Sequence, residues 1–83
     1  VVNTARVPAG AKVAVVGLGG VGFNALLGAR LAGASEIHAV DLLDDKLALA
    51  RELGATSVWR ADTPDLVNAL KDATRGGVDY AFE

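Results

Sequence analysis

A glycine-rich segment after the first run of β-branched residues constrains this chain more than any other feature. Residues 12–16 read as a short strand, and Gly17-Leu18-Gly19-Gly20-Val21-Gly22 follows directly. An apolar helical stretch and a second strand come next, and that strand ends in Asp41, 19 residues after Gly22. This order is typical of a βαβ unit that binds a nucleotide.

Each part of this motif has its own physical role. Gly17 allows a tight turn off the strand, and Gly19 lets the backbone approach a pyrophosphate without a Cβ in the way. Gly22 lets the helix pack closely against the sheet. The helix start offers unpaired N–H groups and the positive end of its dipole to a phosphate. Asp41 can accept two hydrogen bonds from a ribose diol, so the motif in this setting predicts a dinucleotide site.

The rest of the chain continues the alternation of strands and helices. Further strands are predicted at 36–41, 57–60 and 78–82, and helices at 20–32 and 44–53. A third helix is expected to be capped by Asp62 or Thr63, to have Pro64 at its first position and to end at Gly76-Gly77. Its buried face is expected to hold four residues: Leu66, Ala69, Leu70 and Ala73.

The order βαβαβαβ predicts an α/β fold, a doubly wound parallel sheet with right-handed crossovers. We expect the strand order 3-2-1-4, with the first two helices on one face and the third on the other. That second face should be incompletely covered. The helix at 20–32 is nearly all apolar, which predicts burial on almost every side.

Composition limits the function classes. The 83 residues are 52% hydrophobic, although a domain of this size buries only about 60% of its unfolded surface. We therefore interpret 1–83 as a partial Rossmann domain, with residues 1–9 the remnant of a preceding helix and linker. A net charge of −2 argues against a nucleic-acid partner, and no apolar stretch is long enough for a membrane span. The absence of cysteine fits a cytoplasmic location and, with a single histidine, leaves no set of zinc ligands.

Three side chains outside the glycine segment are open to more than one interpretation. Lys46, one turn into the second helix, is either a surface lysine or a ligand of the adenosine ribose. His38 lies within a strand and is expected to be a packed or edge histidine without chemistry. Trp59 is expected to pack either against the second helix or on the adenine side.

The chain from Val13 to Ala55 resembles the coenzyme domain of the zinc-dependent, medium-chain alcohol dehydrogenases. The resemblance rests on Gly17 to Gly22, on Asp41 followed by Lys46, and on the closing Gly76-Gly77-Val78-Asp79-Tyr80-Ala81-Phe82-Glu83. It implies that Gly20 and Val21 hold a pyrophosphate through their N–H groups. It also implies that Asp41 and Lys46 hold the adenosine ribose and that Leu42 flanks the adenine.

The resemblance further implies a parent oxidoreductase that transfers a hydride between an alcohol or aldehyde substrate and NAD. That parent would be a homo-oligomer with a catalytic zinc. In this family the zinc ligands and the backbone that holds the nicotinamide lie outside the matched stretch, so no catalytic or metal residue is assigned here. The isolated chain is expected to be inactive and to bind only the adenosine and pyrophosphate half. NAD is expected over NADP because Leu42 and Leu43 supply no arginine for a 2′-phosphate.

Two other classes share the motif. Adenylating enzymes that activate ubiquitin-like proteins also place an acid after the second strand, but there another acid and an asparagine-arginine pair follow. Here Leu42 and Leu43 follow Asp41, which does not fit that class. A non-catalytic NAD-sensing or nucleotide-sensing module has the same fold and ligand, and only the Gly-Gly-Val-Gly detail and Lys46 argue against it.

Overall fold

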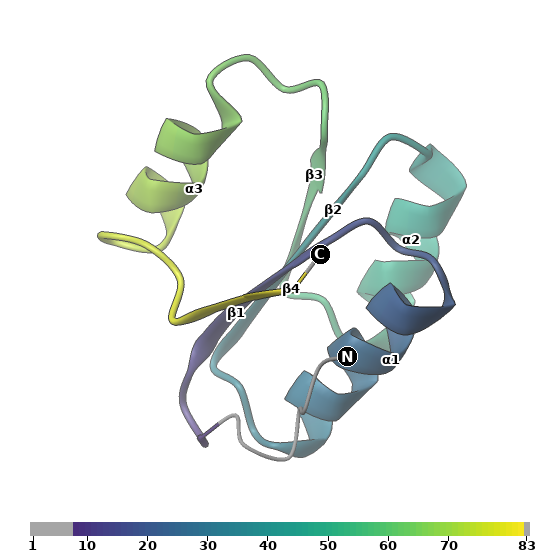
Figure 1. Cartoon of the computed structure of the whole chain (residues 1–83), viewed down its shortest axis with the longest axis vertical. Coiled ribbons are helices and arrows are strands. Elements are labelled where there is room, and N and C mark those ends of the chain that lie inside the picture. Colours follow the sequence, from purple (N-terminus) through teal and green to yellow (C-terminus); the bar gives the residue numbers. More distant parts are fainter. Residues whose placement is uncertain (1–7, 83) are drawn as a thin grey trace.

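A computed structural model describes residues 8–82, which form a parallel four-stranded sheet with helices on both sides (Figure 1). Most of the predicted remnant at 1–9 therefore lies outside the described residues. The strands are β1 (Lys12–Val16), β2 (Glu36–Asp41), β3 (Ser57–Arg60) and β4 (Tyr80–Phe82). The helices are α1 (Gly20–Leu31), α2 (Asp44–Leu53) and α3 (Leu66–Ala73).

The sheet has the predicted order, β3-β2-β1-β4, with every neighbouring pair parallel. β1 pairs with β2 from Lys12 opposite Glu36 to Val16 opposite Val40. On its other side, β1 pairs with β4, where Val15 lies opposite Phe82. Since the strands are parallel, their carboxyl ends lie at one edge of the sheet, and this edge positions the candidate site.

The main core lies between the sheet and the helices α1 and α2, which cover the same face (Figure 1). Alternate strand residues point into it because side chains in a strand alternate between faces. The most deeply buried members from strands and helices are Val13, Val15, Ile37, Ala39, Ala25, Leu26, Ala29 and Ala50. The expectation that α1 is buried on almost every side is wrong for the described residues. Leu31 is 88% exposed, and Val21 and Leu27 are also exposed.

The third helix begins later than predicted. Pro64 lies in a turn, and α3 starts at Leu66 after Asp65, whose backbone is left-handed (φ 54°, ψ 42°). Thr63 closes the preceding turn, at residues 60–63, because its N–H and its hydroxyl both donate to the Arg60 carbonyl, at 3.0 and 2.6 Å. The Thr63 hydroxyl is thus used in the turn, and the Asp62 carboxylate accepts from the Arg60 side chain. The predictions of Pro64 as the first helical residue and of a cap at Asp62 or Thr63 are therefore both wrong.

The buried face expected for α3 is also wrong in part. Leu66, Ala69 and Leu70 are only half-buried, and Ala73 is exposed. The fully buried residue is Thr74, just past the helix, whose hydroxyl donates to the Leu70 carbonyl. The Lys12 ammonium donates to the Thr74 carbonyl, which ties this end of α3 to β1. α3 thus lies on the opposite side of the sheet from α1 and α2, as predicted, but its apolar residues are only partly covered (Figure 1).

The centre of this second face is better covered than expected. Ala14, His38 and Val40 are almost fully buried there, whereas Val16 near the sheet edge is exposed. His38 is packed, as predicted: its Nδ1 accepts the indole N–H of Trp59 at 3.1 Å, and its Nε2 lies 2.9 Å from a Glu36 carboxylate oxygen. Trp59 is the register partner of Val40, so it packs on this face and not against α2.

No helix in the part of the chain that the structure describes is long and apolar enough to cross a membrane.

Candidate functional site

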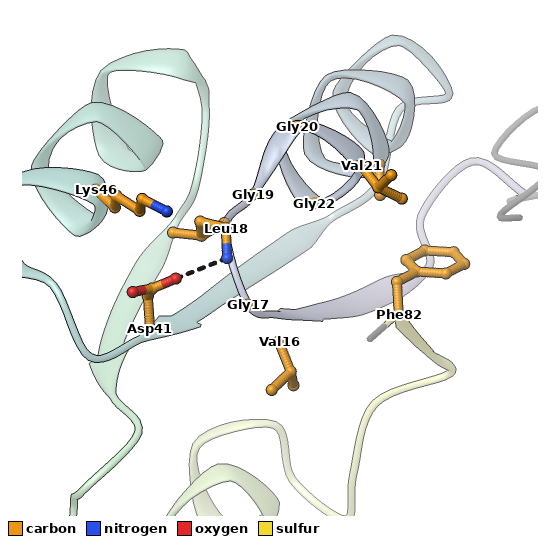
Figure 2. Close-up of a pocket in the computed structure, with 11 residues that line it drawn as sticks. Val16, Gly17, Leu18, Gly19, Gly20, Val21, Gly22, Asp41, Lys46 and Phe82 are labelled. Carbon is orange, nitrogen blue, oxygen red and sulfur yellow. Dashed lines mark hydrogen bonds between the residues drawn. The ribbon is translucent and has the colours of Figure 1, made fainter.

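An open cleft of about 470 Å³ lies at the carboxyl edge of the sheet, above the ends of β1 and β4 and beside the end of β2 (Figure 2). The predicted site residues come together here with one exception, Leu42, which is exposed and does not line the cleft. The lining consists of Val16, Gly17, Leu18, Gly19, Gly20, Val21, Gly22, Ala25, Asp41, Lys46 and Phe82.

Gly17 forms the turn at the end of β1. Its φ of +85° is a conformation that residues with a Cβ rarely adopt, as predicted for this position. Its N–H donates to the Val40 carbonyl at 2.8 Å, which keeps the turn joined to β2. The glycine segment therefore leaves β1 at a fixed angle and leads directly into α1.

The other glycines of the segment have two distinct environments. A Cβ on Gly22 would lie 2.1 Å from the Gly17 carbonyl oxygen, so only glycine lets α1 pack this closely against the turn. A Cβ on Gly19 or Gly20 would meet nothing within 4 Å, because these two residues face the open cleft. Gly22 is thus required by the fold, whereas the absence of side chains at Gly19 and Gly20 leaves space for a ligand.

The start of α1 presents unpaired donors to the cleft. The first intrahelical hydrogen bond runs from the Phe23 N–H to the Gly19 carbonyl, at 2.9 Å. Gly19 is the N-cap residue and has no side chain to cap the helix. The N–H groups of Gly20, Val21 and Gly22 therefore have no partner among residues 8–82. Free N–H groups and the positive end of a helix dipole together favour a phosphate group.

Asp41 lies on the other side of the cleft and connects it to the glycine segment. Its Oδ2 accepts the Leu18 N–H at 2.7 Å (Figure 2). Its Oδ1 accepts the Leu43 N–H at 2.9 Å. The Leu18 bond, then the Leu43 bond, and the nearby Lys46 ammonium lower the pKa of Asp41 below its ordinary value. The carboxylate is therefore ionised at neutral pH. Each of its oxygens retains a lone pair for a further donor.

Lys46 lines the cleft and is half-buried. Figure 2 shows its ammonium directed toward the space above Asp41 and Leu18. It comes from the first turn of α2, while Asp41 comes from the end of β2. The two predicted ribose ligands therefore meet from different elements.

Sequence reasoning missed four lining residues: Val16, Leu18, Ala25 and Phe82. Val16 and Phe82 end adjacent strands, and Phe82 is half-buried against the core while its ring also borders the cleft (Figure 2). The sequence signal for both is their position at the end of a parallel strand, where ligands bind in this type of sheet.

No cluster of three or more histidine, cysteine, aspartate or glutamate residues suited to a metal occurs among residues 8–82.

Comparison with known proteins relates this arrangement to one family. Residues 20–83 match the family model described as zinc-binding dehydrogenase. A solved alcohol dehydrogenase zinc-binding domain protein from Burkholderia ambifaria is 47% identical, with a TM-score of 0.89 over 95% of this chain and 21% of that one. Benzyl alcohol dehydrogenase from Acinetobacter calcoaceticus is 45% identical, with a TM-score of 0.87 over 92% of this chain and 21% of that one.

A third similar structure is 2R,3R-butanediol dehydrogenase from Bacillus subtilis, 39% identical with a TM-score of 0.87 over 94% of this chain and 22% of that one. The chain thus spans about a fifth of the length of these solved proteins. The family match includes the start of α1, Asp41 and Lys46, and the structural matches cover nearly the whole chain. This chain belongs to the zinc-binding dehydrogenase family, whose solved members similar to it include alcohol dehydrogenases.

Proposed function

We propose that this chain binds the adenosine and pyrophosphate half of NAD in an alcohol dehydrogenase. The observation that carries the proposal is one cleft with two complementary sides. The start of α1 supplies unpaired N–H groups and no side chains, which suits a pyrophosphate. Across the cleft, the ionised Asp41 and the ammonium of Lys46 supply an acceptor and a donor for the two ribose hydroxyls.

In the complete protein, NAD would accept a hydride from an alcohol or return it to an aldehyde or ketone. The residues of this chain would bind and orient the cofactor, and we assign them no part in the hydride transfer itself. Because the chain belongs to a dehydrogenase family, this function is favoured over an adenylating enzyme or a nucleotide sensor. Leu42 would contribute only if the adenine extends beyond the cleft over its exposed side chain.

Asp41 also predicts the choice of cofactor. The 2′-phosphate of NADP carries a charge near −2 and would lie a few ångströms from this carboxylate. At ~4 Å and an effective dielectric constant of 20, each pair of like unit charges costs about 4 kcal/mol before screening. Lys46 offsets part of this repulsion. We therefore expect NAD to bind at least ~100-fold more tightly than NADP, a difference of about 2.7 kcal/mol.

The test is a calorimetric titration of the complete protein with each cofactor. The unsubstituted protein should show the preference for NAD, and Asp41→Ser combined with Leu42→Arg should reduce or reverse it. Leu49→Arg, on the exposed side of α2 and away from the cleft, is the control for adding a positive charge. Equal affinities for NAD and NADP in the unsubstituted protein would show that Asp41 does not face the ribose. Failure of NAD to bind at all would contradict the proposed function.

A further inference from the structure

An arginine from a different strand lies beside Asp41. Arg60 ends β3 and is the register partner of Asp41, the last residue of β2. Neighbouring strands lie about 4.8 Å apart, and register partners in parallel strands point to the same face. Arg60 therefore has the position and length to reach the region of the Asp41 carboxylate. Its guanidinium is bonded elsewhere, and Asp41 is bound by two backbone N–H groups instead.

Two aspartates hold the guanidinium of Arg60. Its Nη1 donates to Asp44 Oδ1 at 2.7 Å, from the first residue of α2. Its Nε and Nη2 donate to the two carboxylate oxygens of Asp62, both at 3.1 Å. These bonds raise the pKa of Arg60 further above its ordinary value, and the two carboxylates outnumber its single positive charge. All three side chains are solvent-exposed, so substitution can release the arginine without opening the core.

Sites that accept the 2′-phosphate of NADP generally supply an arginine near the ribose. An arginine suits this role because its planar fork of N–H donors matches a phosphate. Here such an arginine is present, but three of its five N–H donors are already directed at carboxylates.

We propose that Asp44 and Asp62 are positioning residues for cofactor choice, which hold and neutralise Arg60 so that it cannot compensate the charge of a 2′-phosphate. This inference rests on the proposed function, since it concerns the same ribose site. It adds a second source of selectivity to the direct repulsion by Asp41. The sequence around Asp41 does not reveal it, because Arg60 is 19 positions further along the chain.

The experiment compares the dissociation constants of NAD⁺ and NADP⁺ by calorimetry in the complete protein. In Asp44→Ala/Asp62→Ala, the preference for NAD⁺ should fall about tenfold, equivalent to about 1.4 kcal/mol. Asp45→Ala is the matched control. It removes one negative charge from the same helix turn, but Asp45 has no bond to Arg60. Its effect on the preference should stay below about twofold, the size expected from screened surface charge.

A third substitution, Arg60→Gln, tests whether the change in preference comes from the arginine or only from the loss of negative charge. Adding Arg60→Gln to Asp44→Ala/Asp62→Ala should restore the preference for NAD⁺, whereas Arg60→Gln alone should leave it nearly unchanged. Thermal denaturation establishes that each variant is folded, and Asp44→Asn/Asp62→Asn replaces the alanine pair if that pair is not. An unchanged preference in the folded double variant would overturn this inference, as would an equal effect of Asp45→Ala or no reversal by Arg60→Gln. If NAD⁺ itself does not bind the unsubstituted protein, the proposed function fails instead.

Discussion

At the scale of single residues, Asp41 has a second role besides the one its motif indicates. Its two oxygens accept backbone N–H groups from Leu18 in the glycine segment and from Leu43 before α2. The carboxylate therefore fixes the distance between the glycine turn and the end of β2. A ligand that bonds to Asp41 through its remaining lone pairs would meet a side chain already held in place.

We expect Asp41→Asn to lower the free energy of unfolding by about 1–2 kcal/mol. An amide has one acceptor oxygen, so its NH₂ group must face the N–H of either Leu18 or Leu43. Asp45→Asn, in the first turn of α2 and exposed, is the control and should change stability by less than about 0.5 kcal/mol. Urea denaturation followed by circular dichroism measures both, and equal losses in the two variants would contradict this role of Asp41.

The same variant should change the pH dependence of stability. The folded state lowers the pKa of Asp41, chiefly through the Leu18 N–H. Its ionised form therefore stabilises the fold above the ordinary aspartate pKa, and this contribution is lost as the pH falls through the lower folded-state pKa. The difference in stability between Asp41→Asn and the unsubstituted chain should accordingly shrink from neutral pH to about pH 3. Denaturation curves at several pH values test this, and a constant difference would argue against it.

At the scale of elements, one glycine of the glycine-rich segment is needed for folding and another leaves space for a ligand. Gly22→Ala places a Cβ 2.1 Å from the Gly17 carbonyl oxygen and should destabilise the chain by about 1–3 kcal/mol or more. Gly19→Ala meets open space and should change stability by less than about 1 kcal/mol while weakening NAD binding. Thermal denaturation and calorimetric titration of both variants test this. A destabilised Gly19→Ala, or a fully stable Gly22→Ala, would contradict the distinction.

On the second face of the sheet, hydrogen-bonded side chains link β3 to β2: Trp59 to His38, and His38 to Glu36. Their buried neighbours on this face, Ala14 and Val40, are apolar. Because the indole of Trp59 can only donate, the Nδ1 of His38 is the acceptor of that bond, and its Nε2 faces the Glu36 carboxylate. Trp59→Phe leaves the buried Nδ1 without a donor and should lower stability by about 1–2 kcal/mol. A second variant, Trp59→Phe with His38→Leu, removes that unpaired acceptor and should recover part of the loss. Urea denaturation followed by circular dichroism distinguishes the two, and no recovery would argue against the hydrogen bond.

At the scale of the whole molecule, the chain leaves apolar surface without cover. Leu31 at the end of α1 and Val67 on α3 are 88% and 65% exposed, and β4 pairs only with β1 among the described strands. A free strand edge and exposed apolar residues favour association. We expect the 83-residue chain, purified by itself, to self-associate or to bind a hydrophobic dye. Analytical ultracentrifugation and dye fluorescence check this, and a monomer with no dye signal would contradict it.

The sequence was sufficient for the order of the sheet because local signals agree with the global fold. The β-branched strand before Gly17, the helix after it and Asp41 at the next strand end each constrain the same βαβ unit. The start of the third helix was less predictable, since the residues expected to begin it take part in a turn instead. Arg60 and Thr63 form a turn that the preference of Pro64 for a helix start does not overcome.

The amino-acid sequence was enough to predict the parallel topology, the glycine turn and seven of the eleven residues that line the cleft. These depend on local backbone preferences and on the rule that parallel strands end at one edge. The folded chain adds contacts that no local signal indicates. Asp41 is already bonded to Leu18 and Leu43, and Trp59 packs with His38. Arg60 lies beside Asp41 but is held by two other aspartates. Strand register and side-chain direction decide such contacts, and both are set by packing between segments distant in the chain.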